Sequence, residues 1–170
     1  MNLRNLYLIG MMGTGKSAVG KITADVLGLN FIDSDQFIEN QFGLKVSEIF
    51  AEKGEQFFRR LEMDFITDGH PSENSLISCG GGLCTPNGMI DILKENGVVV
   101  TLTATPKTIY ERIKENNSRP LINGANPLEK ITEISNRRKY IYNSSHYSIP
   151  TDELSISEVS ERIIKFYQSI

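Results

Sequence analysis

The chain has 170 residues, of which 39% are hydrophobic and 23% charged, and its formal net charge is −3 at pH 7. This length and composition are typical of one globular domain with a substantial core, and the negative charge argues against a nucleic-acid partner bound by bulk electrostatics. No window approaches the roughly 18 apolar residues of a membrane span, and residues 1–4 precede a strand-like run without a signal-peptide core, so we expect one cytoplasmic, monomeric domain over residues 1–170 with no membrane partner.

Strand and helix signals alternate along the chain. Apolar runs predict strands at residues 6–9, 31–32, 75–78, 98–102 and about 146–149. Apolar residues at helical spacing predict helices at about residues 16–27, 35–42, 46–68, 87–95, 106–115, 127–143 and 155–168. This alternation predicts an α/β fold in three α/β/α layers, with a central five-stranded parallel sheet covered by helices on both faces.

Between the first strand and the first helix the chain reads GMMGTGKS, which has the G-x-x-x-x-G-K-S spacing of a P-loop. Such glycines let backbone N–H groups converge on phosphate oxygens, and the next helix adds the positive end of its dipole. We expect Lys16 to reach the β- and γ-phosphates and Ser17 to ligate Mg²⁺. A plain turn would not need this lysine and serine. The residues expected to hold ATP here are Gly13, Thr14, Gly15, Lys16, Ser17 and Ala18.

The next polar cluster, Asp33-Ser34-Asp35, follows the second strand, at the sheet edge where open α/β folds build their sites. Carboxylates there can order Mg²⁺-bound water, hold a hydroxyl, or take its proton as it attacks the γ-phosphorus. The alternative is that Ser34 or Asp35 caps the next helix, and the residues alone leave both interpretations open.

In the stretch GEQFFRRLEMDFITD, three phenylalanines and a leucine mark a buried stripe, beside which lie Arg59, Arg60 and Glu62. One of these arginines could turn its planar fork toward a carboxylate or a phosphate. A solvated surface position is otherwise the commoner place for a lone arginine.

Three successive glycines, Gly80, Gly81 and Gly82, follow the third predicted strand, so that a ligand could lie against bare backbone. The only two cysteines, Cys79 and Cys84, flank them without zinc-site spacing, and we expect reduced thiols. Further along, the soft polar segment 115–126 is a candidate mobile loop. It carries Arg119, while Arg137 and Arg138 fall on a late helix; an arginine on such a loop can close over a transferring phosphoryl group.

Together these motifs resemble the shikimate kinases, which are small P-loop phosphotransferases of the nucleoside monophosphate kinase-like group. The resemblance covers nearly the whole chain, through LIGMMGTGKSAVG, FIDSD, VSEIFAEKGEQFFRRLE, SCGGG, SRPLI and RRKYIY. It implies transfer of the ATP γ-phosphoryl group to the 3-hydroxyl of shikimate, with one Mg²⁺ ion per subunit, in the route to aromatic amino acids. The alternatives are a related kinase for gluconate or a nucleoside monophosphate, and a non-catalytic nucleotide-binding module.

The resemblance also implies roles on the acceptor side, in a helical region of about residues 33–62 and beyond. Asp35 matches the residue that holds the shikimate hydroxyls, as a base or an orienting group, and Asp33 lies nearer the magnesium water shell. Arg59 and Arg138 match two clamps on the shikimate carboxylate. Arg137 is the alternative second clamp, because Lys-Tyr stands here where the family often has a proline before the tyrosine. The three glycines match the backbone wall of the shikimate pocket.

On the nucleotide side, the resemblance implies a mobile lid at about residues 115–126. Arg119 matches the lid arginine that meets the nucleotide phosphates, and Arg112 is similar to the family residue that packs on adenine. The expected catalytic residues are therefore Lys16, Asp35 and Arg119.

Overall fold

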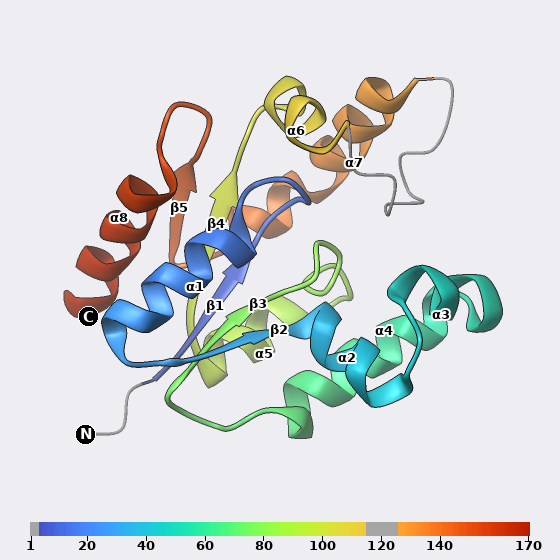
Figure 1. Cartoon of the computed structure of the whole chain (residues 1–170), viewed down its shortest axis with the longest axis horizontal. Coiled ribbons are helices and arrows are strands. Elements are labelled where there is room, and N and C mark those ends of the chain that lie inside the picture. The colour runs from blue at the N-terminus through green and yellow to red at the C-terminus, as the bar shows by residue number, and fades with distance from the viewer. Residues whose placement is uncertain (1–3, 115–125) are drawn as a thin grey trace.

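The structure, a computed structural model, describes residues 4–114 and 126–170 (Figure 1). Its elements alternate between strands and helices, and none of these helices is long and apolar enough to cross a membrane. In chain order they are β1 (Asn5–Ile9), α1 (Lys16–Leu27), β2 (Asn30–Asp33), α2 (Ser34–Phe42), α3 (Val46–Lys53), α4 (Glu55–Asp64), the π-helical turn η1 (Phe65–Gly69), β3 (Ser75–Ser78), α5 (Met89–Asn96), β4 (Gly97–Thr103), α6 (Pro106–Ile113), α7 (Pro127–Tyr142), β5 (Tyr147–Pro150) and α8 (Ile156–Gln168).

The five strands form one sheet in the order β2-β3-β1-β4-β5, and all four pairings are parallel. The central strand β1 is paired on both sides, with Leu6 opposite Leu76 of β3 and Val98 of β4. Because parallel strands need crossover connections, each return between neighbouring strands passes through a helix on one face of the sheet. The predicted five-stranded parallel sheet is confirmed.

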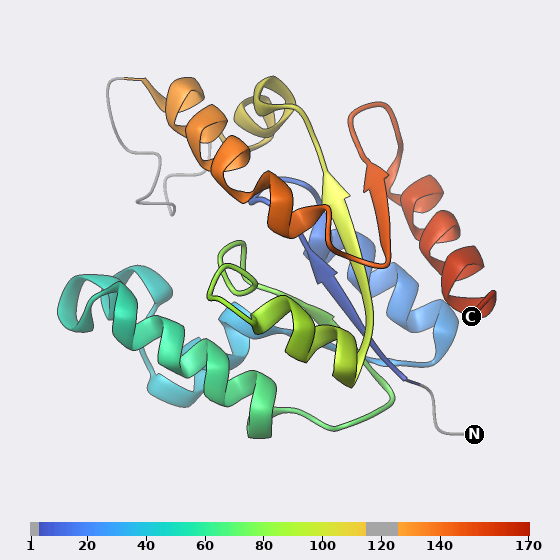
Figure 2. The same ribbon diagram turned by 180° about the vertical axis from the view of Figure 1, so that it is seen from behind.

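Alternate side chains of the strands point into two separate cores. Leu6 and Leu8 of β1 pack with residues of α1 and α8, which cover one face (Figure 1). Tyr7 and Ile9 point the other way and pack with residues of α5, α6 and α7 on the opposite face (Figure 2). A sheet buried on both faces explains the near-continuous apolar character of its strands. The predicted three-layer architecture is confirmed.

Gly20 of α1 lies where this helix meets the sheet. A Cβ atom placed on it would come 2.8 Å from Phe31 Cε2 and 3.0 Å from Leu76 Cδ2. Only a residue without a side chain allows this close an approach, so Gly20 serves helix packing and lies outside the phosphate-binding loop.

The one continuous helix predicted for residues 46–68 is wrong. The segment forms α3 and α4, separated at Gly54, whose backbone angles are φ 82° and ψ 167°. This conformation lies outside the helical region and suits glycine, which has no Cβ to clash. Besides the two cores on the sheet, a third, smaller cluster of buried side chains joins α2, α3 and α4. Its members are Ile38, Ile49 and Phe58. The predicted mobile loop falls almost wholly on residues 115–125, which lie outside the described residues.

Candidate active site

The loop between β1 and α1 has the backbone of a phosphate cradle. Gly10 and Gly13 both have positive φ, 138° and 75°. A Cβ on Gly10 would come 2.2 Å from the carbonyl oxygen of Leu102, so this position requires glycine for both its conformation and its surroundings. The loop then leads into α1, and the N-terminus of a helix attracts anions through its first N–H groups and its dipole.

Lys16 folds back into this loop. Its ammonium group donates to the carbonyl oxygens of Gly10 and Met11, both at 2.9 Å, and the residue is 9% exposed. The positive charge therefore sits inside the cradle of backbone groups. This is the place from which an ammonium group can meet phosphates bound to the loop.

Ser17, in the first turn of α1, meets Asp33, at the carboxyl end of β2. The Ser17 hydroxyl donates to Asp33 Oδ2 at 2.6 Å and lies 3.1 Å from the hydroxyl oxygen of Ser78. Hydroxyl and carboxylate oxygens are the hard ligands that Mg²⁺ takes in proteins. The two residues predicted to serve the metal are thus in direct contact.

The cap of α2 is Asp33, so the alternative that Ser34 or Asp35 caps this helix is wrong. Asp33 Oδ1 accepts from the backbone N–H groups of Asp35 and Gln36, at 3.2 and 3.3 Å. Ser34 instead turns its buried hydroxyl to the loop after β3, where it accepts from the Gly80 N–H at 2.8 Å. The helix starts one residue earlier than predicted because the aspartate ends the strand and caps the helix at once.

The acceptor side is built around the glycine loop, Gly80, Gly81 and Gly82, after β3. A Cβ on Gly80 would lie 2.3 Å from Asp35 Oδ1 and 3.0 Å from Glu62 Oε1. A Cβ on Gly82 would lie 2.5 Å from Arg59 Nη2. The first and third glycines therefore have no side chain because polar side chains from α2 and α4 occupy that space. Cys79 and Cys84, beside this loop, are both free and buried.

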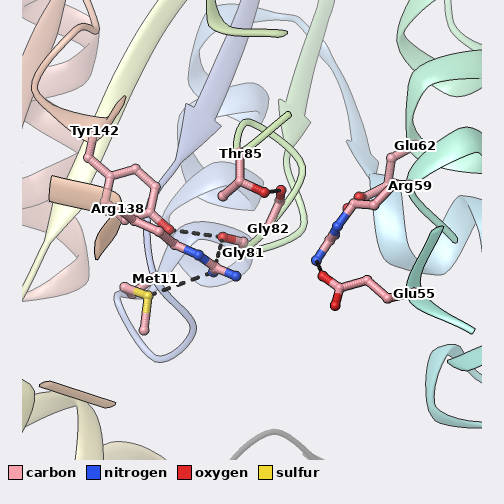
Figure 3. Close-up of polar contacts among 9 residues, drawn as sticks. All are labelled: Met11, Glu55, Arg59, Glu62, Gly81, Gly82, Thr85, Arg138 and Tyr142. Carbon is pink, nitrogen blue, oxygen red and sulfur yellow. Dashed lines mark hydrogen bonds and ion pairs between the residues drawn. The ribbon is translucent and has the colours of Figure 1, made fainter. Parts of the chain in front are cut away.

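Arg138 and Arg59 approach the glycine loop from opposite sides, from α7 and α4 (Figure 3). Arg138 is 7% exposed and donates through Nη1 to the Gly81 carbonyl oxygen at 2.8 Å, next to the Tyr142 hydroxyl, which donates to the same oxygen at 2.9 Å. Arg137 is exposed. Of the two late arginines, Arg138 is thus the one that the fold turns toward the site.

Arg59 is held by two carboxylates of its own helix (Figure 3). Nη1 donates to Glu62 at 2.5 Å, and Nη2 donates to Glu55 at 2.8 Å. Glu62 is 1% exposed, and its other oxygen, Oε1, has no hydrogen-bond partner among the described residues. Burial raises the pKa of Glu62 to about 7, although the ion pair with Arg59 lowers it and the charge of Asp35 raises it further.

The raised pKa of Glu62 predicts a pH-dependent stability. Between pH 4.5 and about 7, Glu62 keeps its proton in the folded chain and has released it in the unfolded chain. The stabilisation of the fold that results is complete below pH 4.5 and is lost as the pH rises through 7. The loss amounts to about 3 kcal/mol of unfolding free energy. Denaturant unfolding of the wild type and of Glu62→Gln across pH 4–8 measures it: the wild type should lose stability relative to the variant as the pH rises. A constant difference between the two would contradict this pKa.

Arg112 of α6 bridges the phosphate-binding loop and the segment after β5. Nη1 donates to the Gly13 carbonyl oxygen at 3.2 Å and to Thr151 Oγ1 at 3.0 Å, and Nη2 donates to the Thr151 carbonyl oxygen at 2.6 Å. The structure therefore places Arg112 beside the loop, on the predicted nucleotide side. Arg119, the predicted lid arginine, lies outside the described residues.

Three side chains that complete this site were not predicted as site residues. They are Glu62, which anchors Arg59; Tyr142, which shares the Gly81 carbonyl oxygen with Arg138; and Ser34, expected at most to cap a helix, which holds the Gly80 N–H. The i, i+3 spacing of arginine and glutamate signals the first pair. No local pattern indicates the other two contacts, which join residues far apart in the chain.

Comparisons with known proteins point to one family. The family model described as "Shikimate kinase" matches residues 12–168. A shikimate kinase of Thermodesulfovibrio yellowstonii is 39% identical over 168 residues, 99% of this chain and 97% of that protein. One of Persephonella marina is 40% identical over 162 residues, 95% of this chain and 98% of that protein. The solved shikimate kinase from Acinetobacter baumannii in complex with shikimate has a TM-score of 0.93 at 32% identity, covering 98% of this chain and 94% of that one. The chain belongs to the shikimate kinase family.

Proposed function

We propose that this protein transfers the γ-phosphoryl group of ATP to the 3-hydroxyl of shikimate, giving shikimate 3-phosphate and ADP, as a cytoplasmic monomer. The observation that carries the proposal is the pair of arginines, Arg59 and Arg138, set on opposite sides of the glycine loop. Two arginine forks facing one space suit a small acceptor that bears a carboxylate.

The donor half of the reaction falls to the phosphate-binding loop. Backbone N–H groups of the loop bind the phosphates, and the ammonium group of Lys16 offsets the charge that spreads over the γ-phosphoryl oxygens during transfer. Arg112 is proposed to pack on adenine. Arg119, within a lid of about residues 115–126, is proposed to meet the phosphates and to help exclude water.

Ser17 and Asp33 fit a magnesium ion. Mg²⁺ is usually held by one or two protein oxygens, waters and substrate phosphates, and the described residues contain no group of three or more His, Cys, Asp or Glu side chains able to form a closed metal cage. Ser17 would ligate the ion directly and Asp33 would act through its waters. When bound, Mg²⁺ neutralises charge on the β- and γ-phosphates.

The acceptor half falls to Asp35, the two arginines and the glycine loop. Arg59 and Arg138 hold the carboxylate, which fixes the orientation of the ring. Asp35, whose Oδ1 lies against Gly80, holds the reacting hydroxyl and orients it or takes its proton. With donor and acceptor both held, alignment of the hydroxyl with the γ-phosphorus supplies much of the rate enhancement.

A coupled assay of ADP release from MgATP tests this function. Shikimate, gluconate and nucleoside monophosphates are compared as acceptors. We expect turnover with shikimate and, at most, background ADP release with the others. Turnover with gluconate or a nucleoside monophosphate in its place would assign the chain to a related kinase activity, and no acceptor-dependent release would indicate a non-catalytic nucleotide-binding module.

A further inference from the structure

The two carboxylates that hold Arg59 lie in different surroundings. The side chain of Glu62 is 1% exposed, whereas that of Glu55, in the first turn of α4, is 61% exposed. Glu62 is fixed by the packing around it. Glu55 has solvent to move into, and an exposed ion pair of this kind is weak enough to exchange.

The exposed contact lies where a ligand carboxylate would bind. A Cβ on Gly82 would come 2.5 Å from Nη2 of Arg59, so this nitrogen borders the glycine loop, and Arg138 borders the same loop from α7 (Figure 3). Nη1 would also lie close to such a Cβ, at 2.7 Å, so a carboxylate held between the two arginines would take an N–H group from this edge of the Arg59 guanidinium. Nη2 at the same edge already donates to Glu55, so the two carboxylates would lie side by side on one guanidinium group.

Two carboxylates on one guanidinium group repel each other, and the repulsion is stronger near the protein than in bulk water. We propose that Glu55 is an internal stand-in for the carboxylate of the acceptor, which neutralises Arg59 in the free enzyme and is displaced when an anionic acceptor binds. The identity of that acceptor rests on the proposed function. Glu55 thereby keeps Arg59 in place in the empty pocket, at the cost of some affinity for the acceptor.

The Glu55→Gln variant tests the proposal, because it keeps the shape of the side chain and removes its charge. The KM for shikimate should fall about two- to fivefold, the range set by an exposed ion pair, while kcat and the KM for ATP stay unchanged. The methyl ester of shikimate carries no negative charge and does not compete with Glu55. Its dissociation constant, measured by calorimetry, should be the same for the variant and the wild type.

The matched control is Glu52→Gln, which removes an exposed charge on α3 that forms no ion pair within the described part of the chain. It should leave the KM for shikimate unchanged. The proposal is overturned if Glu55→Gln leaves this KM unchanged or raises it, if it tightens the neutral ester equally, or if the control lowers the KM as much. The proposed function is tested separately, in the wild-type protein: it fails if the wild type shows no turnover with shikimate.

Discussion

Replacing Lys16 by alanine is expected to lower kcat about 10²- to 10³-fold, the usual effect of losing one charged donor at a site of developing negative charge. The ammonium group lies inside the phosphate-binding loop, bonded to the carbonyl oxygens of Gly10 and Met11. Its removal takes away the cation that lies inside the cradle and would offset the charge of the transferring phosphoryl group. Steady-state kinetics with saturating shikimate and MgATP measure the loss.

The control for this variant is Lys21→Ala. Lys21 is on the same helix, exposed, with its ammonium group 5.9 Å from the centre of the Phe31 ring. It carries the same charge without reaching the loop, so kcat should change less than twofold. If Lys16→Ala retained more than a tenth of wild-type kcat, the phosphoryl-stabilising role of Lys16 would be refuted.

The second large effect is expected at Arg59, on the acceptor side. Arg59→Ala should raise the KM for shikimate about ten- to hundredfold and leave the KM for ATP nearly unchanged. The magnitude follows from the loss of a charge-assisted hydrogen bond, worth about 1.5–3 kcal/mol, at about 1.4 kcal/mol per tenfold. Kinetics with each substrate varied in turn separate the two values. Equal effects on both substrates would contradict the assignment of Arg59 to the acceptor.

Two companion variants keep the Arg59 result interpretable. Arg59→Ala also leaves the buried Glu62 without its cation, which destabilises the fold. Arg59→Lys keeps a positive charge beside Glu62 but loses the planar fork, so the KM for shikimate should still rise while most of the stability is retained. Arg60→Ala is the position-matched control: Arg60 is exposed and packs over the Phe57 ring at 5.6 Å, so neither KM should change.

Most of the fold could be predicted because its signals are local and repeated. Each strand is a short apolar run and nearly every helix an apolar stripe, and the β3 prediction at residues 75–78 matches the observed strand. The error at residues 46–68 came from Gly54. Helical spacing continues on both sides of it, and a glycine inside such a pattern is compatible with a continuous helix. Its positive φ is set by how α3 and α4 pack, which the pattern does not encode.

The site divides in the same way. The loop from Gly10 to Ser17 is one continuous segment between a strand and a helix, so its sequence alone predicts both its conformation and its phosphate ligand. The acceptor side combines α2, α4, α7 and the loop after β3. Its contacts, such as that of Ser34 with Gly80, join residues 46 positions apart and leave no local trace.

The sequence by itself thus determined the donor: a phosphate-binding loop is made of backbone, and the order of glycines, lysine and serine specifies it. Only the tertiary structure decided which late arginine faces the glycine loop. The resemblance favoured Arg138 and left Arg137 as the alternative, and neighbours on a helix point about 100° apart, so only one of them can face this loop. Packing of α7 against the sheet buries Arg138 there and leaves Arg137 exposed. The rotation of a helix about its axis depends on the whole core, and no short stretch of sequence contains it.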